Sequence, residues 1–152
     1  MISLGYVCSY QPQYSLLYRE NQKSIDLCAK NNIGILTYGS IAGGILSGKY
    51  RTEEDCPKDG RTQTYPFYHG EAFKKAMKLV DVLEMIANDH QKPISHVAIN
   101  WVNQQPGITT SLVGMKTPEQ AISNAEAGNW ELSKEELMLI NSTYEKLFGD
   151  QQ

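Results

Sequence analysis

The sequence has few of the features that mark secreted, membrane-bound or nucleic-acid-binding proteins. Its 152 residues include only three cysteines, Cys8, Cys28 and Cys56, an odd number at wide spacing. This argues against a disulfide framework and favours reduced thiols in a cytosolic protein. The formal net charge is −3 and no basic run occurs, so the electrostatic footprint of a nucleic-acid-binding protein is missing. No stretch has the pattern of a transmembrane span or a signal peptide, which predicts a cytoplasmic protein without membrane contact.

Several well-known site motifs are incomplete. The stretch GGILSGKY, residues 43–50, spells the G-x-x-x-x-G-K of a P-loop, but Tyr50 stands where Ser or Thr is needed. The residues that follow Lys49 lack the apolar face of a helix, which argues further against a P-loop. Residues 39–44 have the wrong glycine spacing for a Rossmann fingerprint, and no G-x-S-x-G elbow is present. The histidines lack ligand spacing, so no metal site is predicted.

What is present is an alternation of apolar patterns that predicts strands and helices in turn. Strands are expected over 5–10, 33–38 and 108–113, and helices over 21–32, 71–88 and 94–104. Thr117, Pro118 and Gln120 predict a helix start with a capping box, and Ser133 with Glu136 predicts a second capping box before the last helix. Residues 51–70 are expected to form a long polar connection.

Alternation of this kind predicts parallel strands joined by right-handed crossovers. Three strands are few, because such a sheet leaves two unpaired edges and little cover. We therefore expect the chain to begin within a larger fold, and to form an oligomer or cover one edge with its own segment.

Two loops are candidates for an anion site. One follows the strand at 33–38 and contains Lys49, and the other follows the strand at 108–113 and contains Lys116. Both offer backbone amides, and the second leads into a capped helix start, so together they would suit a phosphate. The alternative is that both are ordinary turns with solvated lysines, and the residues alone leave the two interpretations open.

Three segments in order resemble the aldo-keto reductase family. They are QPQYSLLYRE (11–20), TYGSIAGGILSGKY (37–50) and the stretch from VAINWVNQQPGITTSLVGMKTPEQ onward (97–137). The resemblance runs from Tyr6 to Leu147 and is nearest to the branch that includes the potassium-channel β subunits and bacterial relatives. It implies an α/β fold, a partial (β/α)₈ TIM-type barrel containing the last three strand–helix units. Residues 1–152 would be one domain, the C-terminal half of the barrel, with the N-terminal half and its catalytic tetrad absent; no catalytic residue is therefore assigned.

The resemblance also implies which residues bind NADPH. Gln11 corresponds to the residue that holds the nicotinamide carboxamide, and Tyr38 to the aromatic residue that stacks on its ring. The pyrophosphate would be lined by Gly39, Ser40, Ile41, Gly43, Gly44 and Lys49, with Arg61 further along the same loop. The 2′-phosphate would be held by Gly114, Met115 and Lys116. The adenine would be surrounded by Gln120, Ser123 and Asn124. Gly39-Ser40 replaces the usual Ser-Pro, and Ser123 replaces a frequent Glu, which removes an acceptor for the adenine amine.

These residues also have simpler interpretations. Tyr38 could be a packing residue at a strand end, Arg61 lies in a loop of variable length, and Gln120 could serve only as a capping residue. For the whole chain, the expected function is that of an NADPH-dependent oxidoreductase interconverting carbonyls and alcohols, inactive without an N-terminal half-barrel. The alternatives are a non-catalytic NADP-binding or regulatory module, and a truncated remnant stabilised by self-association.

Overall fold

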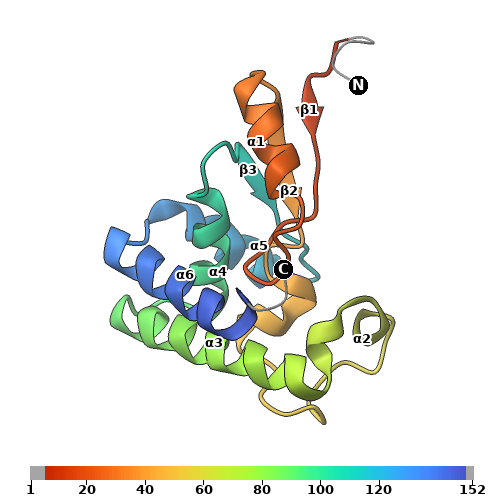
Figure 1. Ribbon diagram of the computed structural model, residues 1–152. Coiled ribbons are helices and arrows are strands. Elements are labelled where there is room, and N and C mark those ends of the chain that lie inside the picture. Colours follow the sequence, from red (N-terminus) through yellow and green to blue (C-terminus); the bar gives the residue numbers. More distant parts are fainter. Residues whose placement is uncertain (1–5, 150–152) are drawn as a thin grey trace.

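The structure is a computed structural model that describes residues 6–149. Three strands alternate with helices, and the helices gather largely on one side of the strands (Figure 1). The order is β1 (Ser9–Tyr10), α1 (Gln22–Lys30), β2 (Gly34–Tyr38), the 3₁₀ helix η2 (Ala42–Ser47), α2 (Arg61–Thr64), η3 (Pro66–Tyr68), α3 (Gly70–Asp89), α4 (Ile94–Asn103), β3 (Thr110–Leu112), α5 (Pro118–Glu126), η4 (Ala127–Asn129) and α6 (Lys134–Phe148).

The strands form one parallel sheet in the order β1-β2-β3. Ser9 lies opposite Gly34, and Tyr38 lies opposite Leu112. Beyond β1 the chain stays attached to the end of β2, because the Tyr14 amide donates to the Tyr38 carbonyl at 3.0 Å. Within residues 6–149, β1 and β3 each pair with β2 alone, so both outer edges are open. The three parallel strands predicted from the sequence are confirmed.

The two faces of β2 differ in burial. Ile35 and Thr37 are fully buried, whereas Leu36 is partly buried and Tyr38 is exposed. Successive strand residues point to opposite faces, so one face packs on the helices and the other is open. Leu112 of β3 is also exposed, at 41%. The open face therefore carries apolar side chains that no element of the described chain covers.

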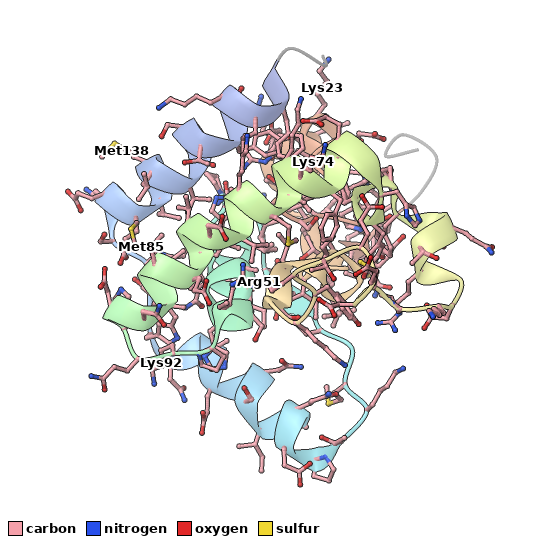
Figure 2. The ribbon with its side chains drawn as sticks, turned by 90° about the horizontal axis from the view of Figure 1, so that it is seen from below. Lys23, Arg51, Lys74, Met85, Lys92 and Met138 are labelled. Atoms are coloured by element: carbon pink, nitrogen blue, oxygen red, sulfur yellow. The ribbon has the colours of Figure 1, made fainter. Side chains whose placement is uncertain are left out.

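The core lies between the sheet and the helices α3, α4 and α6. Leu83 of α3, Trp101 of α4 and Ile140 of α6 are completely buried. Figure 2, seen from below, places α3 alongside α6 with Met85 and Met138 at the outer surface. The amphipathic periodicity of the sequence predicts α3 and α4 to within one residue at each end, and the capping residues at Ser133 predict the start of α6.

A cation stack joins the segment after β1 to the helices. The Arg19 guanidinium carbon lies 4.4 Å from the centroid of the Trp101 ring and 3.6 Å from that of Tyr144. Tyr14 also stacks on Trp101, with 5.8 Å between the centroids. Asn141 accepts hydrogen bonds from both Arg19 and Trp101. The loop that leaves β1 is thereby fixed to α4 and α6.

Several features differ from the sequence-based expectations. The third strand, Thr110–Leu112, is shorter than 108–113, and the connection 51–70 contains the short helices α2 and η3. The first strand is Ser9–Tyr10, shorter than 5–10, and Gly5 lies outside the described residues. The predicted capping box at Thr117 is only half formed, because Gln120 Oε1 accepts from the Lys116 amide at 2.7 Å instead of the Thr117 amide. The second box is confirmed, since Ser133 and Glu136 cap each other's backbone amides.

Candidate functional site

A cavity of about 470 Å³ lies where the loops after β2 and β3 meet. Its walls come from the glycine loop, α2 and the residue after it, the loop after β3, the start of α4 and one side of α5. It brings together most of the positions predicted for a cofactor: Gly39, Ile41, Gly43, Gly44, Lys49, Arg61, Gly114, Met115, Lys116, Gln120 and Asn124. The two candidate loops therefore form one concave site, as the anion-site interpretation requires.

The glycine loop owes its shape to close packing. Gly43 has φ +71°, and a β-carbon there would come within 2.8 Å of the Tyr65 ring. Its carbonyl accepts from the Tyr68 hydroxyl at 2.9 Å and from Arg61 Nη1 at 3.3 Å. Burial raises the pKa of both tyrosines, so they stay protonated and Tyr68 remains a donor. The connection 51–70, predicted only as a polar loop, thus supplies the aromatic wall that fixes the glycines.

The P-loop is excluded by the local structure. After Lys49 the next helix is α2, which begins only at Arg61 and has four residues. No helix start therefore follows the Gly-Lys pair as a P-loop requires. Tyr50 packs its ring in the core at 5% exposure, and its hydroxyl accepts from Arg61 Nη1 at 3.2 Å. The residue that breaks the motif belongs to the wall of the cavity.

Three cations line the cavity, and their surroundings differ. Lys49 and Lys116 are exposed and form no salt bridge within residues 6–149. Arg61 is paired with Asp59, Nη2 to Oδ2 at 2.8 Å. Hydrogen bonds from Arg61 lower the pKa of Asp59 to about 2, with a smaller contribution from the charge of Lys116. The rim is therefore positive overall and suits an anionic ligand.

Helix α5 presents two of its predicted residues and turns the third away. Gln120 and Asn124 line the cavity, as their four-residue spacing predicts. Ser123 instead faces α4, where its Oγ lies 3.0 Å from Nε2 of the buried His96. Burial lowers the pKa of His96, which keeps the imidazole neutral at pH 7. Ser123 thus joins two helices in this structure.

Three more predicted residues lie outside the cavity lining. Gln11 is exposed just beyond β1, and Tyr38 is 44% exposed at the end of β2. Both are at the carboxyl ends of neighbouring strands, and Tyr38 directly precedes the glycine loop in the chain. Ser40 is buried, and its hydroxyl has no hydrogen-bond partner among the described residues.

Four lining residues were not predicted: Ser47, Tyr50, Tyr65 and Ser95. The aromatic run Tyr65-Pro66-Phe67-Tyr68 inside a polar connection was the available signal for Tyr65. Ser95 carries no local signal, because it enters the wall only through the placement of α4 against the glycine loop. No cluster of metal-ligating side chains occurs in the part of the chain that the structure describes. In the same part, no helix combines the length and apolarity needed to cross a bilayer.

Comparison with known proteins gives a consistent result. The sequence profile of the aldo/keto reductase family matches residues 6–145. The aldo-keto reductase YhdN of Bacillus subtilis is 32% identical over 142 residues, covering 92% of this chain and 43% of the relative. The L-glyceraldehyde 3-phosphate reductase of Escherichia coli O157:H7 is 29% identical, covering 87% and 40%.

A solved structure shares the fold. Glycerol dehydrogenase from Gluconobacter oxydans superposes with a TM-score of 0.84 at 24% identity, covering 95% of this chain and 44% of that one. The chain thus spans less than half the length of each of these three proteins.

Proposed function

Because the chain belongs to the aldo/keto reductase family, we propose that it supplies the NADP-binding part of an oxidoreductase that interconverts carbonyls and alcohols. The observation that carries the proposal is the cavity itself, in which a glycine loop, three cations and the start of α5 converge. NADPH carries a pyrophosphate and a 2′-phosphate, and a positive, amide-rich concave surface is the environment that such groups need.

The residues present fit the phosphate end of the cofactor. Lys49 and the glycine loop would hold the pyrophosphate, and Lys116 in the loop after β3 would hold the 2′-phosphate. Gln120 and Asn124 would flank the adenine, without Ser123, whose hydroxyl is engaged with His96. When bound, the cofactor would supply the hydride.

The nicotinamide end is less enclosed. Gln11 and Tyr38 lie beyond the cavity, at the exposed strand ends beside the open face of the sheet. We propose that a complementary part of the barrel covers this face and carries the proton donor. Barrels of this kind have eight parallel strands and about 250 residues, and the described chain has three strands. We propose that this chain is a partial barrel, the C-terminal half, of the branch that includes the potassium-channel β subunits and bacterial relatives.

Near the cavity, burial raises the pKa of Tyr65, and the Tyr50 hydroxyl accepts a hydrogen bond from Arg61. The resemblance assigns the proton donor to the complementary part of the barrel and not to this chain, so we expect no aldehyde reduction by the chain alone. The free cysteines Cys8, Cys28 and Cys56 suit the cytoplasm.

A non-catalytic NADP-binding or regulatory module is the second candidate, favoured by the same assignment of the proton donor to another part of the barrel. It would bind the cofactor equally well but would stay inactive after the complementary part is supplied.

The binding proposal is tested by replacing Lys116. A charge-assisted contact is worth about 1.5–3 kcal/mol, so Lys116→Ala should weaken NADPH binding roughly ten- to a hundred-fold and scarcely change NADH binding. Lys49→Ala should weaken both cofactors alike, because both contain pyrophosphate. Affinities would be measured by titration calorimetry, with Lys74→Ala as the control because Lys74 is exposed on α3 and does not line the cavity (Figure 2). Equal loss for both cofactors in Lys116→Ala, or tighter binding of magnesium-ATP than of NADPH, would reject the assignment.

A further inference from the structure

The guanidinium of Arg61 is already occupied by groups of the protein. Nε donates to Asp59 Oδ1 at 2.9 Å, and Nη2 donates to Asp59 Oδ2 at 2.8 Å. Nη1 contacts the Gly43 carbonyl at 3.3 Å and the Tyr50 hydroxyl at 3.2 Å. Arginine binds carboxylates and phosphates through the same two-pronged edge. The edge that a phosphate would use is therefore the edge that Asp59 uses.

Asp59 is held in this position by more than one contact. Its Oδ1 also accepts from the Arg61 backbone amide at 3.0 Å. The hydrogen bonds from Arg61 keep the carboxyl ionised above about pH 2, and Lys116 is near enough for its charge to act in the same direction. The carboxylate of Asp59 thus occupies the hydrogen-bonding edge of Arg61, one of the three cations that line the cavity.

The other two cations lack such a counter-ion. Lys49 and Lys116 form no salt bridge in the described part of the chain, so an anion can reach them without breaking one. We propose that Asp59 is an intramolecular competitor for the anion subsite of Arg61, and that a phosphate-bearing ligand gains this arginine only by displacing the Asp59 carboxylate. The inference rests on the proposed cofactor site and adds a residue that opposes binding there. A doubly charged phosphate monoester displaces a carboxylate more readily than a singly charged phosphodiester.

Removing the charge of Asp59 should therefore tighten binding, a direction opposite to that of most substitutions in a site. For Asp59→Asn we expect the dissociation constants of NADPH and of inorganic pyrophosphate to fall about three- to ten-fold, because the broken pair is exposed and charge-assisted. Glu54→Gln is the matched control: it changes the net charge equally on the same loop, and Glu54 makes no hydrogen bond or salt bridge within residues 6–149. We expect less than a two-fold effect from it.

Two more variants test the route through Arg61. In a chain that already carries Arg61→Gln, adding Asp59→Asn should no longer tighten ligand binding, and its effect on the dissociation constant should equal that of Glu54→Gln. Asp59→Glu keeps the charge, so it should not tighten binding. Tightening by Asp59→Glu would point to loosening of the loop and would overturn the proposal. Weaker binding in Asp59→Asn would also overturn it, because Asp59 would then be closing over the ligand instead of competing with it.

The two probes separate this inference from the proposed function. If pyrophosphate binds and Asp59→Asn tightens it while NADPH does not bind the wild-type chain, the competitor stands and the cofactor assignment fails. If NADPH binds, and Asp59→Asn changes its dissociation constant no more than Glu54→Gln does, the cofactor assignment stands and the competitor proposal fails. If neither probe binds any variant, both fail.

Discussion

At Gly43 the backbone adopts a left-handed conformation and lies so close to the Tyr65 ring that a β-carbon would come within 2.8 Å of it. The Gly43 carbonyl is also the point at which Tyr68 and Arg61 meet. One residue therefore connects the glycine loop, the aromatic wall and the arginine of the cavity. A residue with a side chain would fit at this position only if the Tyr65 ring moved.

Gly43→Ala should lower the free energy of unfolding by about 2–4 kcal/mol, because a β-carbon adds backbone strain at positive φ and a clash with Tyr65. Gly60→Ala is the control, since Gly60 has negative φ and a β-carbon there would meet nothing within 4 Å. Urea denaturation followed by tryptophan fluorescence would compare the two. Equal stability of the variants would mean that the loop relaxes around the methyl group.

At the scale of elements, the end of α3 is linked to the start of α6. His90, which follows the last residue of α3, has its Nε2 2.7 Å from Glu136 Oε1. The other oxygen of Glu136 accepts from the Ser133 amide at 2.7 Å in the capping box. His90 also lies against Trp130, with the ring centroids 4.6 Å apart. This junction holds together two helices of the core.

Glu136→Gln should reduce stability at pH 7 by about 1 kcal/mol, because a charge-assisted cap and its contact to His90 are weakened. Burial raises the pKa of Glu136, but the hydrogen bonds from Ser133 and His90 outweigh it, so the pKa is lowered overall. A lowered pKa gives stability that is present above the unfolded value of about 4.3 and is lost as the pH falls through the folded value. The difference between wild type and variant should therefore shrink as the pH falls below about 4.

Thermal unfolding across pH 3–7 would measure this. Glu135→Gln is the matched control, since Glu135 lies beside Glu136 in the first turn and its side chain makes no hydrogen bond within the described residues. A variant difference in Glu136→Gln that stays constant over the whole range would contradict the coupling.

At the scale of the whole molecule, helices cover only one face of the sheet in the described chain. Leu36, Tyr38 and Leu112 lie on or beside the open face, and both sheet edges are unpaired in the described chain. An unpaired polar group costs about 1–3 kcal/mol once it is buried without a partner. Exposed edges of this kind invite pairing with other strands.

We therefore expect the isolated chain to associate with itself. A fragment that carries the preceding strands of a relative's barrel should replace this self-association and restore NADPH-dependent aldehyde reduction.

The variant Leu112→Lys should weaken self-association, measured by light scattering at matched concentration, because it places a charge on the open face. Met85→Lys is the control, since Met85 is exposed on α3 away from the sheet (Figure 2). A monodisperse wild-type monomer with both strand edges protected in hydrogen exchange would contradict the expectation. Self-association that persists with the fragment present, or binding without activity, would favour the non-catalytic alternative.

Helices α1, α3, α4, α5 and α6, the capping box at Ser133, the parallel direction of the strands and the two loops that carry Lys49 and Lys116 could all be predicted from the sequence. The helices, caps and loops follow from amphipathic period, capping residues and glycines, which act over a few neighbouring residues. The parallel direction follows from the alternation of strands and helices. The sequence does not predict that Arg61 pairs with Asp59, that Ser123 turns to His96 or that Tyr65 and Ser95 line the cavity.

The contact of Ser123 with His96 and the places of Tyr65 and Ser95 depend on how close separately folded segments come, and a shift of one or two ångströms decides whether a hydrogen bond forms. The length of β1 depends on its neighbour in the same way: Ser9 and Tyr10 pair with Gly34 and Ile35, and the pairing then stops until Gln13 lies opposite Tyr38. Pro12 stands in this gap and has no backbone N–H to donate to a ladder.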